Sequence, residues 1–282
     1  MNENTVNVSA YRFVQISRSR LPEIRQDLLS CAQALKLKGT VLLSTEGINL
    51  FVAGPSNNIE SFFHKLNTYT EFFDLPRKDS LSDKQPFTRM LVRIKKEIIS
   101  MGCEEVKPYE KTAPHLSPTD FKQWMDENKD MVILDTRNDY EVKLGSFDSA
   151  IDLNIKTFRE FPKALDQLPE DIKNKPIVTF CTGGIRCEKA AELMHQKGFN
   201  DVYQLDGGIL NYFEQCEGTH YNGECFVFDK RVAVDSKLQE TSTTQCYACR
   251  MPLNDTHPAD APCTHCAGNP LTGEKKYSVV SS

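Results

Sequence analysis

Hydrophobic positions along the first hundred residues follow two patterns. Short runs rich in β-branched and aromatic side chains predict strands, and apolar residues at helical spacing predict helices. The strands are expected at 11–16, 40–44, 48–53 and 90–99, and the helices at 22–37 and 57–69. The order strand, helix, strand, strand, helix, strand is the ferredoxin-like split βαβ pattern. We therefore expect a ferredoxin-like (acylphosphatase-like) α+β domain over residues 1–101.

The pattern changes after this segment. Residues 102–118 hold three prolines and little periodicity, which predicts a linker. Beyond it, short apolar runs that suit buried parallel strands alternate with helical segments. The strands are expected at 131–135, 176–180 and 202–205, and the helices from Ser117-Pro118 onward, at 157–168 and at 187–197. This alternation predicts a doubly wound α/β domain over residues 119–222, with its ligand at the carboxyl ends of the strands.

Composition narrows the function classes. Hydrophobic residues make up 39% of the 282 residues and charged residues 26%, as is typical of a soluble globular protein. No apolar run approaches the roughly 20 residues of a membrane span, and the start of the chain lacks the apolar stretch of a signal peptide. We therefore expect a cytoplasmic protein without a membrane partner. No G-x-G-x-x-G follows a predicted strand, so the sequence carries no flavin or nicotinamide fingerprint.

The segment after the run at 176–180 carries the candidate chemistry. It reads Cys181-Thr182-Gly183-Gly184-Ile185-Arg186 and lies between a buried strand and a helix start. The glycines let several backbone N–H groups point inward, and the helix N-terminus and Arg186 add positive potential. A thiol in such a cradle ionises below its ordinary pKa of about 8.5. We predict that Cys181 is the catalytic thiolate; the alternative is a structural cysteine at a strand end.

Three further residues are candidates for supporting roles. Asp135 and Arg137 follow a buried strand, and we expect them to brace the loop rather than to catalyse. Cys187 follows the loop directly. It either resolves a persulfide or disulfide on Cys181, or is a small residue in the first helical turn that faces the core.

Four ordered motifs in this region resemble those of a rhodanese domain. They are the Asp135-Thr136-Arg137 motif with Glu141, the stretch 145–154, the six-residue loop 181–186 and the Leu-Asp-Gly-Gly motif at 205–208. The chain departs from the pattern at Ser146 and Ser149, where histidine and glycine are usual. Four residues separate Cys181 from Arg186, whereas cysteine phosphatases have five. The shorter loop favours a sulfur-sized cradle over phosphate hydrolysis.

The flanking segments narrow the resemblance. Residues 42–49, 86–98 and 181–194 together resemble the bacterial rhodanese-domain tRNA uridine(34) hydroxylases, over roughly residues 8–230. The resemblance implies an oxygen-dependent conversion of the wobble uridine of tRNA to 5-hydroxyuridine, with molecular oxygen as co-substrate and tRNA as partner. The first alternative is a sulfurtransferase that moves sulfane sulfur through a Cys181 persulfide. The second, a non-enzymatic binding module, has no need of a cysteine in an anion cradle.

The distribution of charge along the sequence indicates which residues could bind RNA. The net charge of −5 excludes binding of nucleic acid by the overall field, so a local basic face is required. Residues 11–38 and 86–98 are the basic stretches of the first domain. Within the second stretch we predict phosphate contacts by Arg89, Arg93 and Lys95. The alternative is an ordinary solvated surface.

Ten cysteines in a chain without a secretion signal indicate thiol chemistry or metal binding rather than disulfides. Four of them form two C-x-x-C pairs in the tail at 223–282: Cys246, Cys249, Cys263 and Cys266. This spacing resembles a four-thiolate zinc site, with an inner spacing slightly shorter than usual. A disordered thiol-rich tail and a redox relay that returns electrons to Cys181 remain as alternatives.

Overall fold

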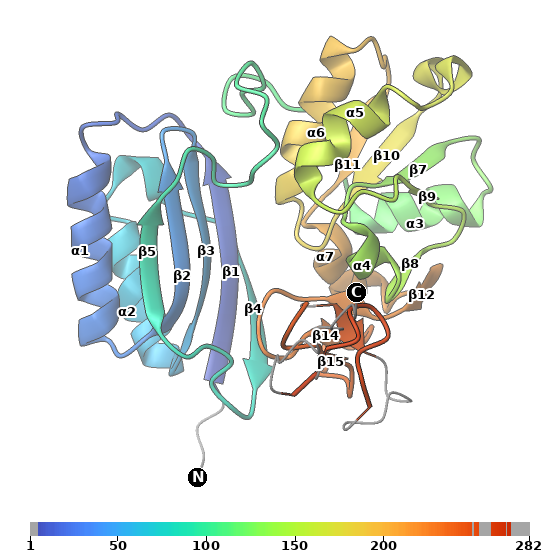
Figure 1. Cartoon of the computed structure of the whole chain (residues 1–282). Helices are drawn as coiled ribbons and strands as arrows, with labels where there is room; N and C mark the ends of the chain where they lie inside the picture. Colours follow the sequence, from blue (N-terminus) through green and yellow to red (C-terminus); the bar gives the residue numbers. More distant parts are fainter. Residues whose placement is uncertain (1–4, 250, 254–260, 269, 272–282) are drawn as a thin grey trace, which may run out of the picture.

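The computed structural model describes residues 5–249, 251–253, 261–268 and 270–271. It has two α/β units side by side, and the cysteine-rich tail packs beneath the second of them (Figure 1). This confirms the predicted fold class. Among the described residues, no helix is both long enough and apolar enough to cross a membrane.

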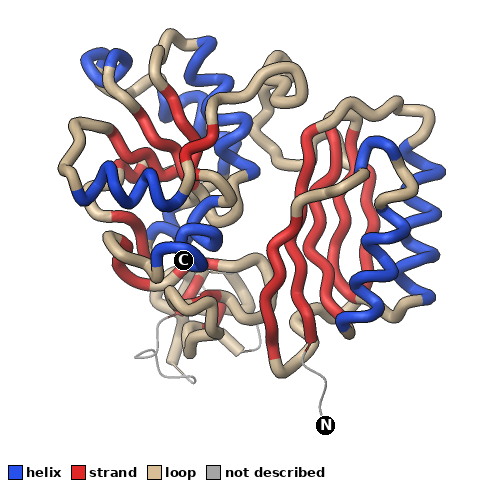
Figure 2. Tube along the Cα trace, turned by 180° about the vertical axis from the view of Figure 1, so that it is seen from behind, coloured by secondary structure: helices blue, strands red, loops and turns tan. Residues whose placement is uncertain are grey.

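The first domain is a five-stranded sheet covered on one face by two helices (Figure 2). Its strands are β1 (Thr5–Phe13), β2 (Lys38–Ser44), β3 (Gly47–Gly54), β4 (Arg77–Ser82) and β5 (Met90–Ile94), and its helices are α1 (Leu21–Ala34), α2 (Ser56–Leu66) and the 3-10 turn η1 (Thr70–Phe72). Alternate strand residues such as Val41 and Leu50 are buried against apolar helix residues such as Leu28 and Phe62. The opposite face of the sheet is turned toward the second domain (Figure 1).

The strand that closes the ferredoxin-like sheet is not the predicted one. The sheet order is β4-β1-β3-β2-β5, in which β4 pairs antiparallel with β1. Residues 90–99 were expected to close the unit, but β5 lies at the other edge, parallel to β2. The sequence of β4, Arg-Lys-Asp-Ser-Leu-Ser, lacks apolar alternation because none of its side chains is buried. β4 therefore forms through backbone hydrogen bonds to β1, and its sequence has no hydrophobic pattern from which a strand could be predicted.

The second domain has a five-stranded parallel sheet of order β6-β11-β10-β7-β9. The strands are β6 (His115–Leu116), β7 (Val132–Asp135), β9 (Ile151–Asp152), β10 (Ile177–Phe180) and β11 (Val202–Leu205). The helices are α3 (Pro118–Asp126), α4 (Asp139–Val142), α5 (Phe161–Leu165), α6 (Ile185–Gln196) and α7 (Gly208–Cys216), with 3-10 turns η2 (Phe158–Glu160) and η3 (Glu170–Asn174). Ile177 packs with residues of α5 and α6, and Val178 with residues of α3 and α7. The sheet is therefore buried on both faces, as expected for short apolar parallel strands.

The predicted linker, residues 102–118, is only partly a linker. Val106 and Ala113 are buried in the core of the second domain, and β6 pairs with β11 at the edge of its sheet. These few apolar residues lie among prolines and charges, so no periodicity marks them. The predicted start of α3 is present, because the Ser117 hydroxyl accepts a hydrogen bond from the Asp120 N–H at 3.0 Å.

Three short two-stranded sheets follow the second domain, and the first of them joins residues 221–223 to it. β8 (Gly145–Phe147) pairs with β12 (Tyr221–Gly223), β13 (Cys225–Phe226) with β14 (Ala233–Val234), and β15 (Thr244–Gln245) with β16 (Pro252–Leu253). The first part of the predicted tail, from residue 223, therefore continues the rhodanese unit; residues 254–260 and 272–282 lie outside the described residues.

Candidate active site

The candidate loop follows β10 at the carboxyl edge of the parallel sheet. Gly184 lies in the left-handed region at φ 97° and caps α6, and its N–H donates to the Cys181 sulfur at 3.1 Å. A Cβ at Gly184 would lie 2.8 Å from the Tyr11 hydroxyl oxygen. Glycine therefore permits both the turn and the approach of the first domain. The Gly184 N–H and the start of α6 thus lie against the Cys181 sulfur.

The environment of Cys181 favours its thiolate. Complete burial opposes ionisation, but a hydrogen bond from the Cys187 thiol, the charge of Arg186 and backbone N–H groups of Arg186 and Gly184 outweigh it and lower the pKa of Cys181 to about 6. Burial and the neighbouring Cys181 raise the pKa of Cys187 well above its ordinary value. Near neutral pH the pair is therefore a thiolate hydrogen-bonded by a thiol.

Arg186 is held by a buried carboxylate. Its two terminal nitrogens donate to the two oxygens of Glu141 at 2.6 and 2.7 Å, and both side chains are buried. The same carboxylate accepts the N–H of Asn138 at 3.1 Å at the start of α4. This bidentate pair fixes the guanidinium beside the loop. Glu141 was noted in the sequence together with the Asp-Thr-Arg motif, but the sequence did not indicate that it pairs with Arg186.

Asp135 and Arg137 form a second buried pair at the end of β7. The Arg137 Nη2 donates to Asp135 at 2.7 Å and to the Gly145 carbonyl at 2.6 Å. Ser146, which stands where rhodanese domains usually have histidine, donates to Asp135 at 2.9 Å. The pair thus joins β7 to β8, while Glu141 is the residue that contacts the loop arginine.

The N-terminus of α7 supports the loop from its other side. The N–H groups of Ile209 and Leu210 donate to the carbonyls of Cys181 and Thr182 at 3.0 and 3.1 Å. A Cβ at Gly208 would lie 2.4 Å from the Cys181 carbonyl oxygen. The Leu-Asp-Gly-Gly motif therefore has a structural reason: glycine lets α7 approach the loop backbone. The sequence pattern had not predicted α7 itself.

A cleft of about 1130 Å³ separates the two domains, and Cys181 lies on its wall. The open face of the first sheet supplies one side through residues of β1, β3 and β4. The loop, the start of α7 and the hairpin of β13 and β14 supply the other. Cys181 thus lines a chamber that neither domain forms alone.

A buried lysine fixes the two domains relative to each other. Lys189, on α6 and 1% exposed, lies 2.8 Å from carboxylates of both Glu46 and Glu97 in the first domain. Glu46 also accepts the N–H of Ile98 at 2.7 Å. The Ser-Thr-Glu-Gly-Ile-Asn segment around Glu46 is therefore part of the contact between the two domains, and it contacts α6, the helix that follows the active loop.

Comparison with known proteins agrees with these two domains. Residues 5–98 match the UPF0176 acylphosphatase-like domain, and residues 117–215 match the rhodanese-like domain. A protein named tRNA uridine(34) hydroxylase from Cupriavidus pinatubonensis is 45% identical over 274 residues, which cover 93% of this chain and 96% of the relative. Another of that name, from Paraburkholderia xenovorans, is 48% identical over 254 residues, covering 87% and 88%. The chain belongs to the tRNA uridine(34) hydroxylase family.

The rhodanese part of this tRNA uridine(34) hydroxylase family member is also similar to solved structures. The rhodanese-like domain of an Anabaena sp. protein is 22% identical, with a TM-score of 0.33, and covers 39% of this chain and 79% of that chain.

The basic residues predicted to contact RNA lie on β5 or beside it. Arg89, Arg93 and Lys95 are exposed, and none has an ion pair with a described residue. Lys95 lines the cleft, whereas Arg89 and Arg93 lie outside the residues that line it. Three of the six basic residues in the other predicted stretch, Arg12, Arg20 and Arg25, bond within the first domain. Arg20 pairs with Glu71, and the Arg25 Nε donates to the Val92 carbonyl at 3.0 Å.

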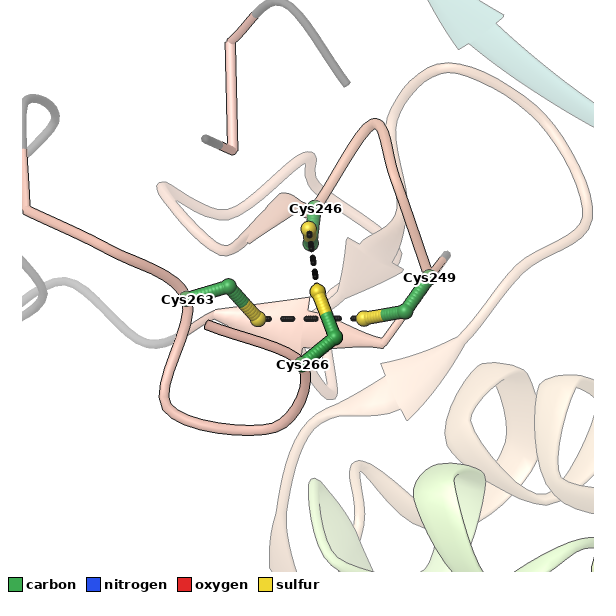
Figure 3. A group of neighbouring side chains, drawn as sticks. All are labelled: Cys246, Cys249, Cys263 and Cys266. Atoms are coloured by element: carbon green, nitrogen blue, oxygen red, sulfur yellow. Dashed lines mark hydrogen bonds between the residues drawn. The ribbon is translucent and has the colours of Figure 1, made fainter. Parts of the chain in front are cut away.

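The four tail cysteines of this family member converge (Figure 3). Their sulfur atoms all lie within 4.8 Å of one another, with 3.9 Å between Cys246 and Cys266 and 3.7 Å between Cys249 and Cys263. A tetrahedral site with zinc–sulfur bonds of about 2.3 Å has sulfur–sulfur edges of about 3.8 Å. The cluster therefore has the ligands and dimensions to hold one metal ion.

Proposed function

We propose that this protein hydroxylates uridine 34, the wobble uridine of tRNA, to 5-hydroxyuridine, with molecular oxygen as co-substrate. The observation that carries the proposal is the position of an activated thiolate, Cys181, on the wall of a cleft between two domains. The names of the full-length relatives support the substrate.

A cysteine-dependent route follows from the loop chemistry. The Cys181 thiolate adds to C6 of the uracil, which makes C5 nucleophilic toward the oxidant. Loss of the C5 proton and departure of the thiolate then restore the ring. One oxygen atom enters the product and the other leaves as water, so an external reductant supplies two electrons. A Cys181 persulfide or a peroxide-derived species on Cys181 is the alternative form of the reactive sulfur.

The surrounding residues have distinct roles in this route. Arg186, held by Glu141, and the N–H of Gly184 stabilise the thiolate when it forms and when it departs. Cys187 donates a hydrogen bond to the thiolate, which supports a role in tuning its pKa. Asp135 and Arg137 hold β7 and β8 together in the scaffold.

The alternative function, sulfur transfer through a Cys181 persulfide, is not favoured. Rhodanese chemistry accounts for the loop alone, but the relatives named tRNA uridine(34) hydroxylase match both domains. A sulfurtransferase also gives no reason for a chamber closed by the sheet of the first domain.

We further propose that the four tail cysteines bind one zinc ion. Their mutual sulfur distances fit a tetrahedral thiolate site. Bound zinc would join the C-x-x-C segments and stabilise the tail, which continues from the hairpin that lines the cleft.

With tRNA as the partner, we place the enzyme in the cytoplasm, and we assign Arg89, Arg93 and Lys95 to contacts with RNA phosphates.

The test is hydroxylation by the purified protein. An unmodified tRNA transcript with uridine at position 34 is incubated with the protein, a reductant and air, and the nucleosides are measured by mass spectrometry. We expect 5-hydroxyuridine with this transcript, and none with cytidine at position 34 or under nitrogen. Thiosulfate sulfurtransfer without any tRNA product would instead support the alternative.

A further inference from the structure

An exposed aromatic ring lies in the cleft beside the active loop. Phe228 is 44% exposed and lines the cleft together with Cys181. The guanidinium carbon of Arg186 lies 5.7 Å from its ring centroid. A large apolar ring exposed inside a chamber offers a flat surface that a ligand can cover, and burying it there is favourable.

The position of Phe228 is fixed by its neighbours. The buried ring of Phe226 packs edge-on against it at 5.2 Å, and Phe51, from β3 of the first domain, lies at 6.2 Å. The Phe226 carbonyl accepts the Thr182 hydroxyl at 3.3 Å, which links the hairpin to the active loop. At the far side of the same hairpin, Arg231 donates to Ser80 on β4 at 2.9 Å. Phe228 is therefore a fixed ring between both domains.

The charges that line the cleft suit a polyanionic ligand. Each lining carboxylate has a cationic or hydrogen-bonding partner: Asp79, Glu97, Glu188, Asp206, Glu214 and Asp229. Three lining cations have no carboxylate partner among the described residues: Arg12, Lys95 and Arg159. An apolar ring inside, with cations around it that lack a carboxylate counter-charge among the described residues, matches a nucleotide, which has a flat base and a phosphate.

We infer that Phe228, backed by Phe51, is the platform on which the target uracil stacks while its C6 edge faces Cys181. This inference rests on the proposed function and deepens it by assigning the residues that hold the base. A π-face contact is independent of base identity, so the platform contributes affinity and position, and polar contacts must select uridine.

The first experiment measures stacking without requiring turnover. The indole introduced by Phe228→Trp reports a stacked base through quenching of its fluorescence, and the wild type corrects for Trp124, the single native tryptophan. The probe is an anticodon stem-loop RNA with uridine at position 34, compared with the same RNA carrying an abasic residue there. We expect strong quenching by the uridine RNA and weak quenching by the abasic RNA. Equal quenching would overturn the inference, even if the protein hydroxylates tRNA.

The second experiment measures turnover. Phe228→Ala should lower kcat/KM for tRNA hydroxylation by roughly 5- to 150-fold, the equivalent of about 1–3 kcal/mol for one stacked base, and Phe228→Trp should retain most of it. The pH at which activity is half-maximal should not move, because the loop is unchanged. Phe73→Ala is the matched control, since Phe73 is 64% exposed and lies outside the cleft lining. If Phe228→Ala behaves like this control, the platform is refuted; absence of hydroxylation by the wild type would refute the proposed function instead.

Discussion

Replacement of Glu141 by glutamine tests how the active loop is held. Glu141 and Arg186 are 0% and 4% exposed in their side chains and share two hydrogen bonds. Glu141→Gln keeps the size of the side chain but removes the carboxylate that pairs with the buried Arg186 charge. Removal of one partner of a buried ion pair typically costs about 3–5 kcal/mol. With a urea dependence of about 2 kcal/mol/M, the midpoint of unfolding should fall by roughly 1.5–2.5 M.

The assay follows the one tryptophan of the chain. Trp124 lies on α3 and packs edge-on against Tyr203 on β11 at 5.2 Å, so its fluorescence reports unfolding of the second domain. The control is Glu170→Gln, which removes a surface pair with Lys173 in which Glu170 is 84% exposed; it should shift the midpoint by less than about 0.5 M. Equal shifts for the two variants would refute the reasoning that the buried pair supports the loop.

Three further predictions concern protonation, metal and RNA. Because the pKa of Cys181 is lowered to about 6, the reactive thiolate forms as pH rises through that value; activity should therefore rise between about pH 5 and 7, and kcat/KM against pH measures it. Freshly purified protein should contain about one zinc per chain by elemental analysis, and less than about a tenth would contradict the thiolate site. A variant with three basic residues replaced by glutamine should bind tRNA about 1–3 kcal/mol more weakly, and its affinity should depend less on salt. Affinity is measured at two salt concentrations, with thiosulfate turnover as the control. Unchanged affinity would exclude these phosphate contacts. The residues replaced are Arg89, Arg93 and Lys95.

The sequence predicted those parts of the fold that local chemistry specifies. Apolar runs located the buried strands β7, β10 and β11, and Ser117-Pro118 located the start of α3. The polar strand β4 was missed because its pairing depends on the backbone of β1. β6 was missed because two residues that pair with β11 carry no periodic pattern.

In the candidate site, too, features that depend on neighbouring residues were predicted, and features that depend on tertiary packing were not. The glycines, arginine and helix start around Cys181 are contiguous in the chain, so the cradle could be predicted from spacing. The partner of Arg186, 45 positions away in the sequence, depends on how α4 packs against the loop. Phe228 and Tyr11 enter the cleft from a hairpin and from the other domain, and no local pattern distinguishes them from core aromatics. The cysteine spacing, in contrast, predicted a four-sulfur cluster, and the four sulfur atoms do lie close together in the structure.

The central claim is that the Cys181 thiolate carries out hydroxylation of the wobble uridine. The most direct measurement is nucleoside mass spectrometry of a tRNA transcript after reaction with wild type, Cys181→Ser and Cys187→Ser, each shown to be folded by its tryptophan fluorescence. We predict 5-hydroxyuridine with the wild type, none with Cys181→Ser, and a reduced amount with Cys187→Ser, because only the hydrogen bond to the thiolate is weakened. Formation of 5-hydroxyuridine by folded Cys181→Ser at the wild-type rate would contradict the account.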